Sequence, residues 1–152
     1  MPITNPYTPP VFMTEGAASI CVQDICRYRC NTLLVGPQDA TEHLLMLLRP
    51  YLHGPAVWKR PQHAELELPP ECRVLVLQNV SALSAHDQAT IGRWLDTHRT
   101  QLISTNPQPL FPLIALGLFD EALYYRLNVM LLGVGLAPPS RLEEEADMSS
   151  LR

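Results

Sequence analysis

Short apolar runs, each closed by a turn or a proline, recur along the 152-residue chain and predict buried strands. The clearest run is RVLVLQNV at residues 73–80, because strands covered on both faces of a parallel sheet are continuously hydrophobic. The run at Thr32–Val35 ends at Gly36 and Pro37, which predict a turn directly after that strand. The same pattern predicts further strands at Ala56–Lys59, Gln101–Asn106 and residues 129–134.

Between these runs, apolar residues recur at the spacing of amphipathic helices. Residues 15–29 form the first predicted helix, and the leucine-rich residues 42–52 form a second one, capped by Asp39 or Thr41. Ser84 is predicted to cap a third helix that extends to His98, and further helical segments are predicted around Leu113 and at residues 119–127. Strands that alternate with helices predict a three-layer α/β fold with a mostly parallel sheet.

One domain is expected, with a different composition at each end of the chain. Residues 1–13 form a proline-rich arm, since four prolines within residues 1–12 exclude a helix or a central strand. Residues 14–135 contain all the predicted elements and form the α/β core. Residues 136–152 carry Glu143, Glu144, Glu145 and Asp147, and we expect an acidic, solvated tail there.

Composition and charge narrow the possible functions. The net charge of −4 argues against direct DNA binding, because binding to phosphates needs clustered lysines and arginines. The longest apolar run, residues 129–137, is far shorter than the roughly 20 residues of a membrane span. The N-terminal sequence has no basic segment followed by an apolar stretch, so no secretory signal is predicted. We therefore expect a cytoplasmic protein with no membrane association.

The four cysteines do not have the spacing of a metal site. Cys21, Cys26 and Cys30 are five and four residues apart, Cys72 is distant, and no C-x-x-C occurs. On a helix, Cys26 and Cys30 share a face with Val22, which is typical of small packing residues. No metal and no disulfide is expected in a cytoplasmic chain.

The most distinctive motif lies near the end of the core. Residues 123–128 read LYYRLN and follow Gly117-x-Phe119, while upstream the strand ends in STN at Asn106. This segment resembles the AAA+ domain of bacterial sigma-54-dependent transcription activators, including response regulators. In that family a strand ending in ATN precedes a helix with the motif G-x-FREDLYYRLN.

Two further segments extend the resemblance over residues 15–132. Residues 32–43, TLLVGPQDATEH, occupy the place of the family's strand and phosphate-binding loop. Residues 73–88, RVLVLQNVSALSAHDQ, occupy the place of its strand ending in Asp-Glu. The resemblance implies a P-loop NTPase-like AAA+ core with about five parallel strands. We expect this core to lack the family's helical lid, because the sequence stops soon after the last predicted strand.

The family's phosphate loop uses several glycines, a lysine for the β- and γ-phosphates and a hydroxyl for magnesium. In this chain Gly36 and Thr41 remain, but Pro37 removes a backbone donor and Asp39 adds a negative charge. Glu42 stands where the lysine would be. A carboxylate in place of an ammonium group reverses the field on a polyanion, and we expect ATP to be repelled.

The second half of the implied site is altered in parallel. Gln78 and Asn79 replace the Asp-Glu pair, and neutral amides can neither neutralise magnesium nor act as a base. Asp120 replaces one of the family's two arginines that reach a neighbouring nucleotide. The second arginine survives as Arg126, and the sensor-type Asn106 also survives. The chain is therefore predicted not to be an ATPase and to have no catalytic residues and no cofactor.

The loop that contacts sigma-54 in the family, GAFTGA, has no room here. Glu42 and Gln78 are only 36 positions apart, too few for the insertion that carries it. The resemblance therefore does not extend to remodelling of sigma-54 polymerase.

Two interpretations remain open for the aromatic and basic residues after Asp120. Arg126 and Tyr124 are candidates for contact with a neighbouring AAA+ subunit. Alternatively, Arg126 is a surface arginine paired with Asp120, Glu121 or the tail, and Tyr124 and Tyr125 are packing residues.

The sequence predicts a protein-interaction module in transcription regulation that associates with itself or with an active sigma-54 activator. The alternative is a residual nucleotide switch, or a very slow ATPase completed by a partner, that uses Gly36, Thr41, Asn106 and Arg126 with ATP and magnesium. A remnant with no selected role is the third possibility.

Overall fold

A six-stranded parallel sheet forms the centre of the computed structural model, which describes residues 11–12, 15–54, 56–62 and 65–135. The strand order is β1-β6-β2-β5-β4-β3, and every neighbouring pair is parallel. The strands are β1 (Val11–Phe12), β2 (Thr32–Val35), β3 (Ala56–Lys59), β4 (Val74–Leu77), β5 (Gln101–Asn106) and β6 (Met130–Gly133). Five strands follow the predicted runs, and the two-residue β1 adds an outer strand beside β6.

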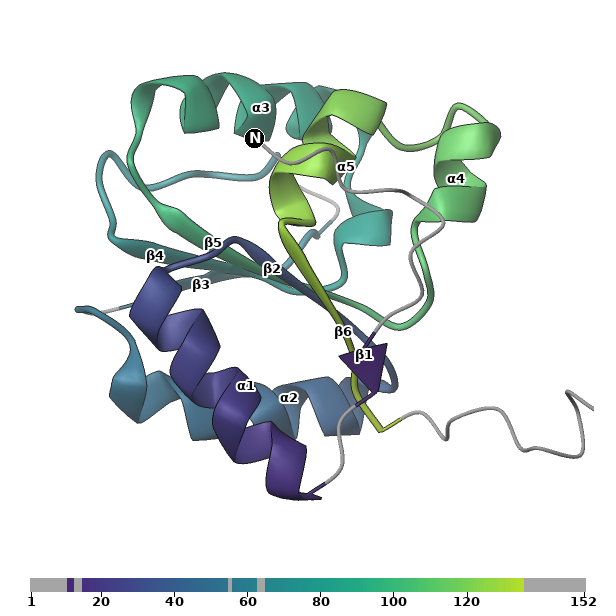
Figure 1. The fold of residues 1–152 in the computed structure, drawn as a ribbon. Helices are drawn as coiled ribbons and strands as arrows, with labels where there is room; N and C mark the ends of the chain where they lie inside the picture. Colours follow the sequence, from purple (N-terminus) through teal and green to yellow (C-terminus); the bar gives the residue numbers. More distant parts are fainter. Residues whose placement is uncertain (1–10, 13–14, 55, 63–64, 136–152) are drawn as a thin grey trace, which may run out of the picture.

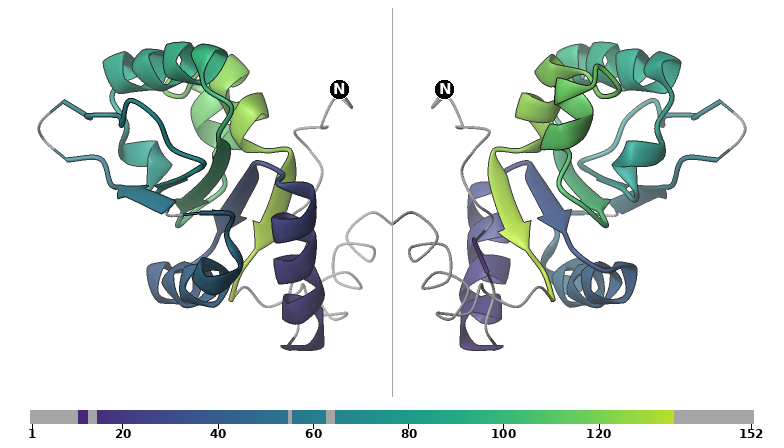
Figure 2. Two further views of the ribbon diagram at one scale, coloured as in Figure 1. Left: turned by 90° about the vertical axis from the view of Figure 1, so that its left-hand side faces the viewer. Right: turned by 90° about the vertical axis from the view of Figure 1, so that its right-hand side faces the viewer.

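Helices cover both faces of this sheet, so the molecule has three layers (Figure 1). One face carries α1 (Glu15–Tyr28) and α2 (Gln38–Leu48), and the other carries α3 (Ala85–Thr97) and α5 (Glu121–Leu127). The side views in Figure 2 show the two layers on opposite sides of the strands. The short α4 (Phe111–Ala115) leads into α5, and within the described residues no helix follows β6.

Two hydrophobic clusters fill the spaces between the layers. Because side chains alternate along a strand, Val74 and Val76 of β4 join one cluster, while Leu75 and Leu77 join the other. Every residue of β2, β4 and β5 is buried, as expected for the middle strands of a sheet covered on both faces. None of the described helices combines the length and hydropathy that a membrane span requires.

The start of α2 differs from its prediction. The helix begins at Gln38 rather than Glu42, because Pro37 at the N-cap has a φ of −53°, which suits the entry to a helix. No side chain caps this terminus, so neither Asp39 nor Thr41 has the predicted role. Thr41 lies inside the first turns, where its hydroxyl donates to Gln38 O at 3.0 Å.

The predicted strand at residues 73–80 also ends early, at Leu77. Asn79 has a φ of 57°, a left-handed conformation that ends the extended run and opens a short 3₁₀ turn at Val80–Ala82. The Ser84 cap is confirmed, since its hydroxyl accepts from Asp87 N at 3.1 Å. The predicted helices at residues 15–29 and from Ser84 to His98 are confirmed to within one residue at their ends.

Gly36 lies where β2 passes closest to the end of β6. A Cβ atom at this position would lie 1.9 Å from the backbone oxygen of Val134, a separation that no side chain tolerates. Val134 N in turn donates to Val35 O at 2.8 Å, so backbone pairing fixes the two segments at this distance. Close packing of two strands is therefore sufficient to require glycine at position 36.

We expect Gly36→Ala to lower the free energy of unfolding by about 3 kcal/mol, because backbone must move to admit the methyl group. Gly92→Ala is the matched control, since a Cβ there meets nothing within 4 Å. It should raise stability by about 0.5–1 kcal/mol through helix propensity. Equilibrium unfolding in urea measures both, and equal effects of the two substitutions would contradict the packing argument.

Candidate functional site

The carboxyl edge of the sheet gathers the residues that the sequence singled out. Turns after parallel strands meet at one edge, and this is where α/β folds bind ligands. A single small cavity there is lined by all six predicted residues, Gly36, Thr41, Glu42, Gln78, Asn79 and Asn106, together with Gln38, Arg60, Thr105 and Pro107. The sequence-based grouping of these distant residues therefore corresponds to one place in the fold.

This cavity is too small for a nucleotide. Its volume is about 40 Å³. Sites for small molecules commonly have volumes of roughly 300–1,000 Å³, whereas a cavity of roughly 10–15 Å³ can hold one water. In this conformation the cavity has room for only a few water molecules.

Polar side chains of the protein itself occupy the space. Glu42 forms an ion pair with Arg60, with 3.1 Å between Oε1 and Nη2. Gln38 Nε2 donates to the same carboxylate oxygen at 2.9 Å, and Arg60 Nη2 donates to Gln78 Oε1 at 3.4 Å. These contacts join α2 to the ends of β3 and β4 across the mouth of the cavity.

Arg60 is the residue that the sequence analysis missed. It follows β3, and the β3–β4 register pairs Lys59 with Leu77, which brings Arg60 beside Gln78. Gln78 N also donates to Lys59 O at 2.9 Å. Nothing in the local sequence marks Arg60, since its position depends on which strand becomes the neighbour of β4.

Arg60 also changes the electrostatic prediction. Glu42 and Arg60 are the two charged residues among those lining the cavity, so its wall carries no net charge. Asp39 is exposed and does not line the cavity, although it was expected to face phosphate. A phosphate group would meet a neutral, internally paired site, and it would have to separate Glu42 from Arg60 to bind.

Asn106 has both ends of its side chain engaged by backbone. Its Oδ1 accepts from Ser81 N at 3.0 Å, and its Nδ2 donates to Gln108 O at 2.6 Å. The side chain is 2% exposed. The backbone N of Asn79 donates to Thr105 Oγ1 at 3.2 Å, and the Asn79 side-chain Oδ1 accepts from Ser81 Oγ at 3.3 Å. These contacts fix the turns after β4 and β5.

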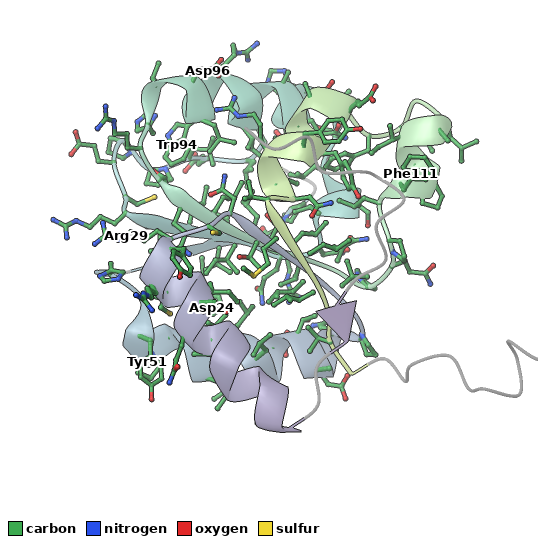
Figure 3. The ribbon with its side chains drawn as sticks, in the orientation of Figure 1. Asp24, Arg29, Tyr51, Trp94, Asp96 and Phe111 are labelled. Carbon is green, nitrogen blue, oxygen red and sulfur yellow. The ribbon has the colours of Figure 1, made fainter. Side chains whose placement is uncertain are left out.

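Arg126 lies outside this cavity, on the face of α5 that meets α3. Its Nη1 donates to Asp96 Oδ1 at 2.6 Å and to Gly92 O at 2.9 Å. The pairing is within the chain, as in the second of the two interpretations, although Asp96 was not among the acids expected to provide it. Figure 3 labels Asp96 on α3, on the same side of the sheet as α5.

Asp120 and Tyr124 have structural roles on α5. Asp120 is the N-cap, and its carboxylate accepts from Leu123 N at 2.9 Å. Tyr124 is 3% exposed, and burial raises the pKa of its phenol. Its hydroxyl accepts from Asn128 Nδ2 at 3.0 Å. A partner could contact Tyr124 only after this part of the core opened, so Tyr124 does not belong to the free surface.

The cysteines show no arrangement for metal binding in the described part of the chain. Cys26, Cys30 and Cys72 are free thiols, and burial raises the pKa of Cys26 and of Cys72. No three described His, Cys, Asp or Glu side chains are grouped closely enough to hold a metal ion.

Solved structures of NtrX from Brucella abortus share this fold. The complex with ATP superimposes with a TM-score of 0.68 at 21% identity, over 98% of this chain and 42% of that chain. The complex with ADP gives 0.66 at 22% identity, over 90% and 38% of the two chains. A third NtrX structure gives 0.65 at 20% identity, over 97% and 41%. No family model and no curated protein sequence matches the chain.

These likenesses confirm the predicted fold class, a three-layer α/β fold built on a parallel sheet, as in the NtrX structures. At 20–22% identity they extend to the fold alone. The chain spans about two-fifths of the length of the NtrX chains, so the activity of a whole NtrX-type protein does not transfer with the fold.

Because Asn106 braces two turns, we expect Asn106→Ala to lower the free energy of unfolding by about 1–3 kcal/mol, the usual cost of leaving buried polar groups unpaired. Gln108→Ala is the control, because it keeps the carbonyl that Asn106 contacts and removes only an exposed side chain. Urea denaturation of both variants tests this, and a neutral Asn106→Ala would remove the structural explanation for this residue.

Proposed function

We propose that this chain is a sigma-54-activator-like AAA+ core that does not hydrolyse nucleotide and acts as a protein-interaction module in transcription regulation. The observation that carries the first part is the Glu42–Arg60 ion pair across a cavity of about 40 Å³. A P-loop site needs space and uncompensated positive charge at this position, and both are missing.

The chemistry of the strand ends supports the same conclusion. Hydrolysis of ATP requires carboxylates that hold magnesium and a group that orients the attacking water. Gln78 follows β4 with its amide oxygen near Arg60, and Asn79 turns the chain in a left-handed conformation. Neither offers a carboxylate. Two of the NtrX structures that share this fold are complexes with ATP or ADP.

The interaction part of the proposal rests on the surface of α3 and α5. The family resemblance of LYYRLN implies that the helix carrying Arg126 faces a neighbouring subunit. The Arg126–Asp96 pair is solvent-accessible, with side chains 37% and 68% exposed. Exposed pairs of this kind contribute about 0.2–1 kcal/mol. A partner that offers a carboxylate can therefore replace Asp96 at small cost. The proposed partner is a second copy of this chain or an active sigma-54 activator.

The second candidate function is a residual nucleotide switch, and one observation favours it. Arg60 is a cation at the cavity, and its ion pair with Glu42 is also half exposed, with side chains 42% and 45% accessible. If Glu42 rotated away, Arg60 would present its guanidinium group to phosphate. Under this alternative, ATP and magnesium bind at the carboxyl edge with Arg60 as the principal contact.

The two functions differ in how Arg60→Gln affects the binding of ATP. Under the proposal, the wild-type protein with ATP and magnesium releases no phosphate above the protein-free blank. Arg60→Gln then leaves the affinity for ATP unchanged. Titration calorimetry and a sensitive phosphate-release assay make the comparison. Micromolar ATP binding that is lost in Arg60→Gln would replace the proposal with the switch.

The partner surface is tested by freeing Arg126. Asp96→Ala should strengthen self-association, or binding to a purified sigma-54 activator, by up to about fivefold, since the competing carboxylate is gone. Arg126→Gln should weaken the same association. Sedimentation velocity and biolayer interferometry give the affinities, and Arg93→Gln on the exposed side of α3 is the control. Absence of both associations in the wild type would refute the interaction role.

A further inference from the structure

The amino edge of the sheet, opposite the cavity at Glu42, carries a second and larger hollow. Its volume is about 430 Å³, and it is lined by Arg29, His53, Arg73, Val74, Arg99, Thr100 and Gln101. Arg73 immediately precedes β4, Arg99 lies two residues before the start of β5, and Arg29 follows the end of α1. Since the starts of parallel strands share one edge, residues 70 positions apart in sequence converge here. Figure 3 labels Arg29 at this end of α1.

The three guanidinium groups have no acidic partner within the described residues. Arg60 and Arg126 are paired with Glu42 and Asp96, and no corresponding ion pair exists for Arg29, Arg73 or Arg99. None of the described carboxylates lines this hollow. Three unpaired cations around one space repel one another, which is unexpected in a chain whose net charge is −4.

The polar groups of the wall are already satisfied within the protein. Gln101 Nε2 donates to Ile25 O at 3.0 Å and to Cys30 O at 3.1 Å, which caps the end of α1. His53 Nε2 lies 3.1 Å from Cys26 O, and Thr100 Oγ1 donates to Cys72 O at 2.7 Å. The wall is thus a fixed scaffold, and the guanidinium groups are the donors left for a ligand.

Backbone geometry positions two of the arginines. Arg29 has a φ of 52°, in the left-handed region that helix ends usually give to glycine or asparagine. Gly54 has a φ of 97°, and a Cβ there would lie 3.3 Å from Cδ of Arg73. The missing side chain at Gly54 leaves room for the aliphatic stem of Arg73. Arg29 thus has a backbone conformation that favours glycine, and Gly54 leaves the space that Arg73 needs. Both features shape this hollow.

We propose that this hollow binds a small anion with two or more phosphoryl groups. A guanidinium group matches phosphate oxygens with two parallel hydrogen bonds, and three such groups suit a ligand with several negative charges. The volume exceeds that of a single phosphate and falls within the usual range for small-molecule sites. None of the described Phe, Tyr or Trp side chains lines the hollow, so recognition rests on the phosphoryl groups.

An adjoining hollow of about 480 Å³ defines the limits of the site. It shares Arg73, Arg99 and Thr100 with the first but also contains Glu71. A carboxylate there disfavours an anion, so the ligand is placed on the side of Arg29 and His53. The site is separate from the carboxyl-edge cavity and does not depend on whether that cavity holds a nucleotide.

Inorganic pyrophosphate is the probe, titrated by calorimetry into the full-length protein at low ionic strength without magnesium. We expect binding in the micromolar range that weakens roughly tenfold or more in Arg73→Gln and in Arg99→Gln, because each loses a charged hydrogen-bonding group. Arg93→Gln removes an exposed arginine that does not line the hollow, and Arg60→Gln alters the opposite edge. Both controls should change the affinity by less than about twofold.

Three results would overturn the proposal. The first is no pyrophosphate binding by the wild type at low salt. The second is an equal loss in Arg93→Gln and Arg73→Gln, which would indicate attraction by overall charge. The third is citrate binding as tightly as pyrophosphate, which would assign the hollow to carboxylates. Equal melting temperatures of the four variants and the wild type exclude misfolding as the cause of any loss.

Discussion

Burial of the parallel sheet on both faces is the constraint from which the rest of the structure follows. The middle strands β2, β4 and β5 have no exposed face, so their side chains divide between two hydrophobic clusters. Polar chemistry is thereby confined to the two edges where strands begin and end. The carboxyl edge collects the turns after β2, β4 and β5, and the amino edge collects the residues before β4 and β5.

The two edges of the sheet use their charges in opposite ways. At the carboxyl edge the side chains satisfy one another, with Glu42 bonded to Arg60 and Asn106 to backbone groups. At the amino edge the Gln101 amide and the Thr100 hydroxyl bind backbone carbonyls, and the arginines remain unpaired. A site whose charges are neutralised from within resists ligands, whereas a site with unpaired charges attracts them. This difference in pairing is the physical reason why we propose anion binding at the amino edge and no nucleotide hydrolysis at the carboxyl edge.

Sequence reasoning was most reliable where the pattern is local. The strands at Thr32–Val35, Ala56–Lys59 and Gln101–Asn106 were predicted with their observed bounds, because each short strand and the residues that end it lie within a few positions. The predicted start of α2 was wrong, because backbone geometry decides whether the helix begins after a cap at Asp39 or after Pro37. Convergence of Gly36, Glu42 and Gln78 on one cavity followed from the family resemblance and is seen in the fold.

Features that depend on strand order could not be predicted from the sequence. Arg60 reaches Gln78 only because β3 pairs with β4, and Arg126 reaches Asp96 only because α5 packs on the side of α3. Burial of Tyr124 likewise depends on how α5 is rotated against the sheet. A helix of seven residues has too few positions to define its buried face by periodicity.

The Glu42–Arg60 pair also bears on how such a chain evolves. A lysine at position 42, which a phosphate loop needs, would place two cations side by side and leave Arg60 without a partner. A change toward nucleotide chemistry at position 42 is therefore unfavourable until Arg60 changes too, and neither substitution alone supplies carboxylates after β4. This dependence of one position on another is epistasis, and it favours keeping Glu42 and Arg60 together.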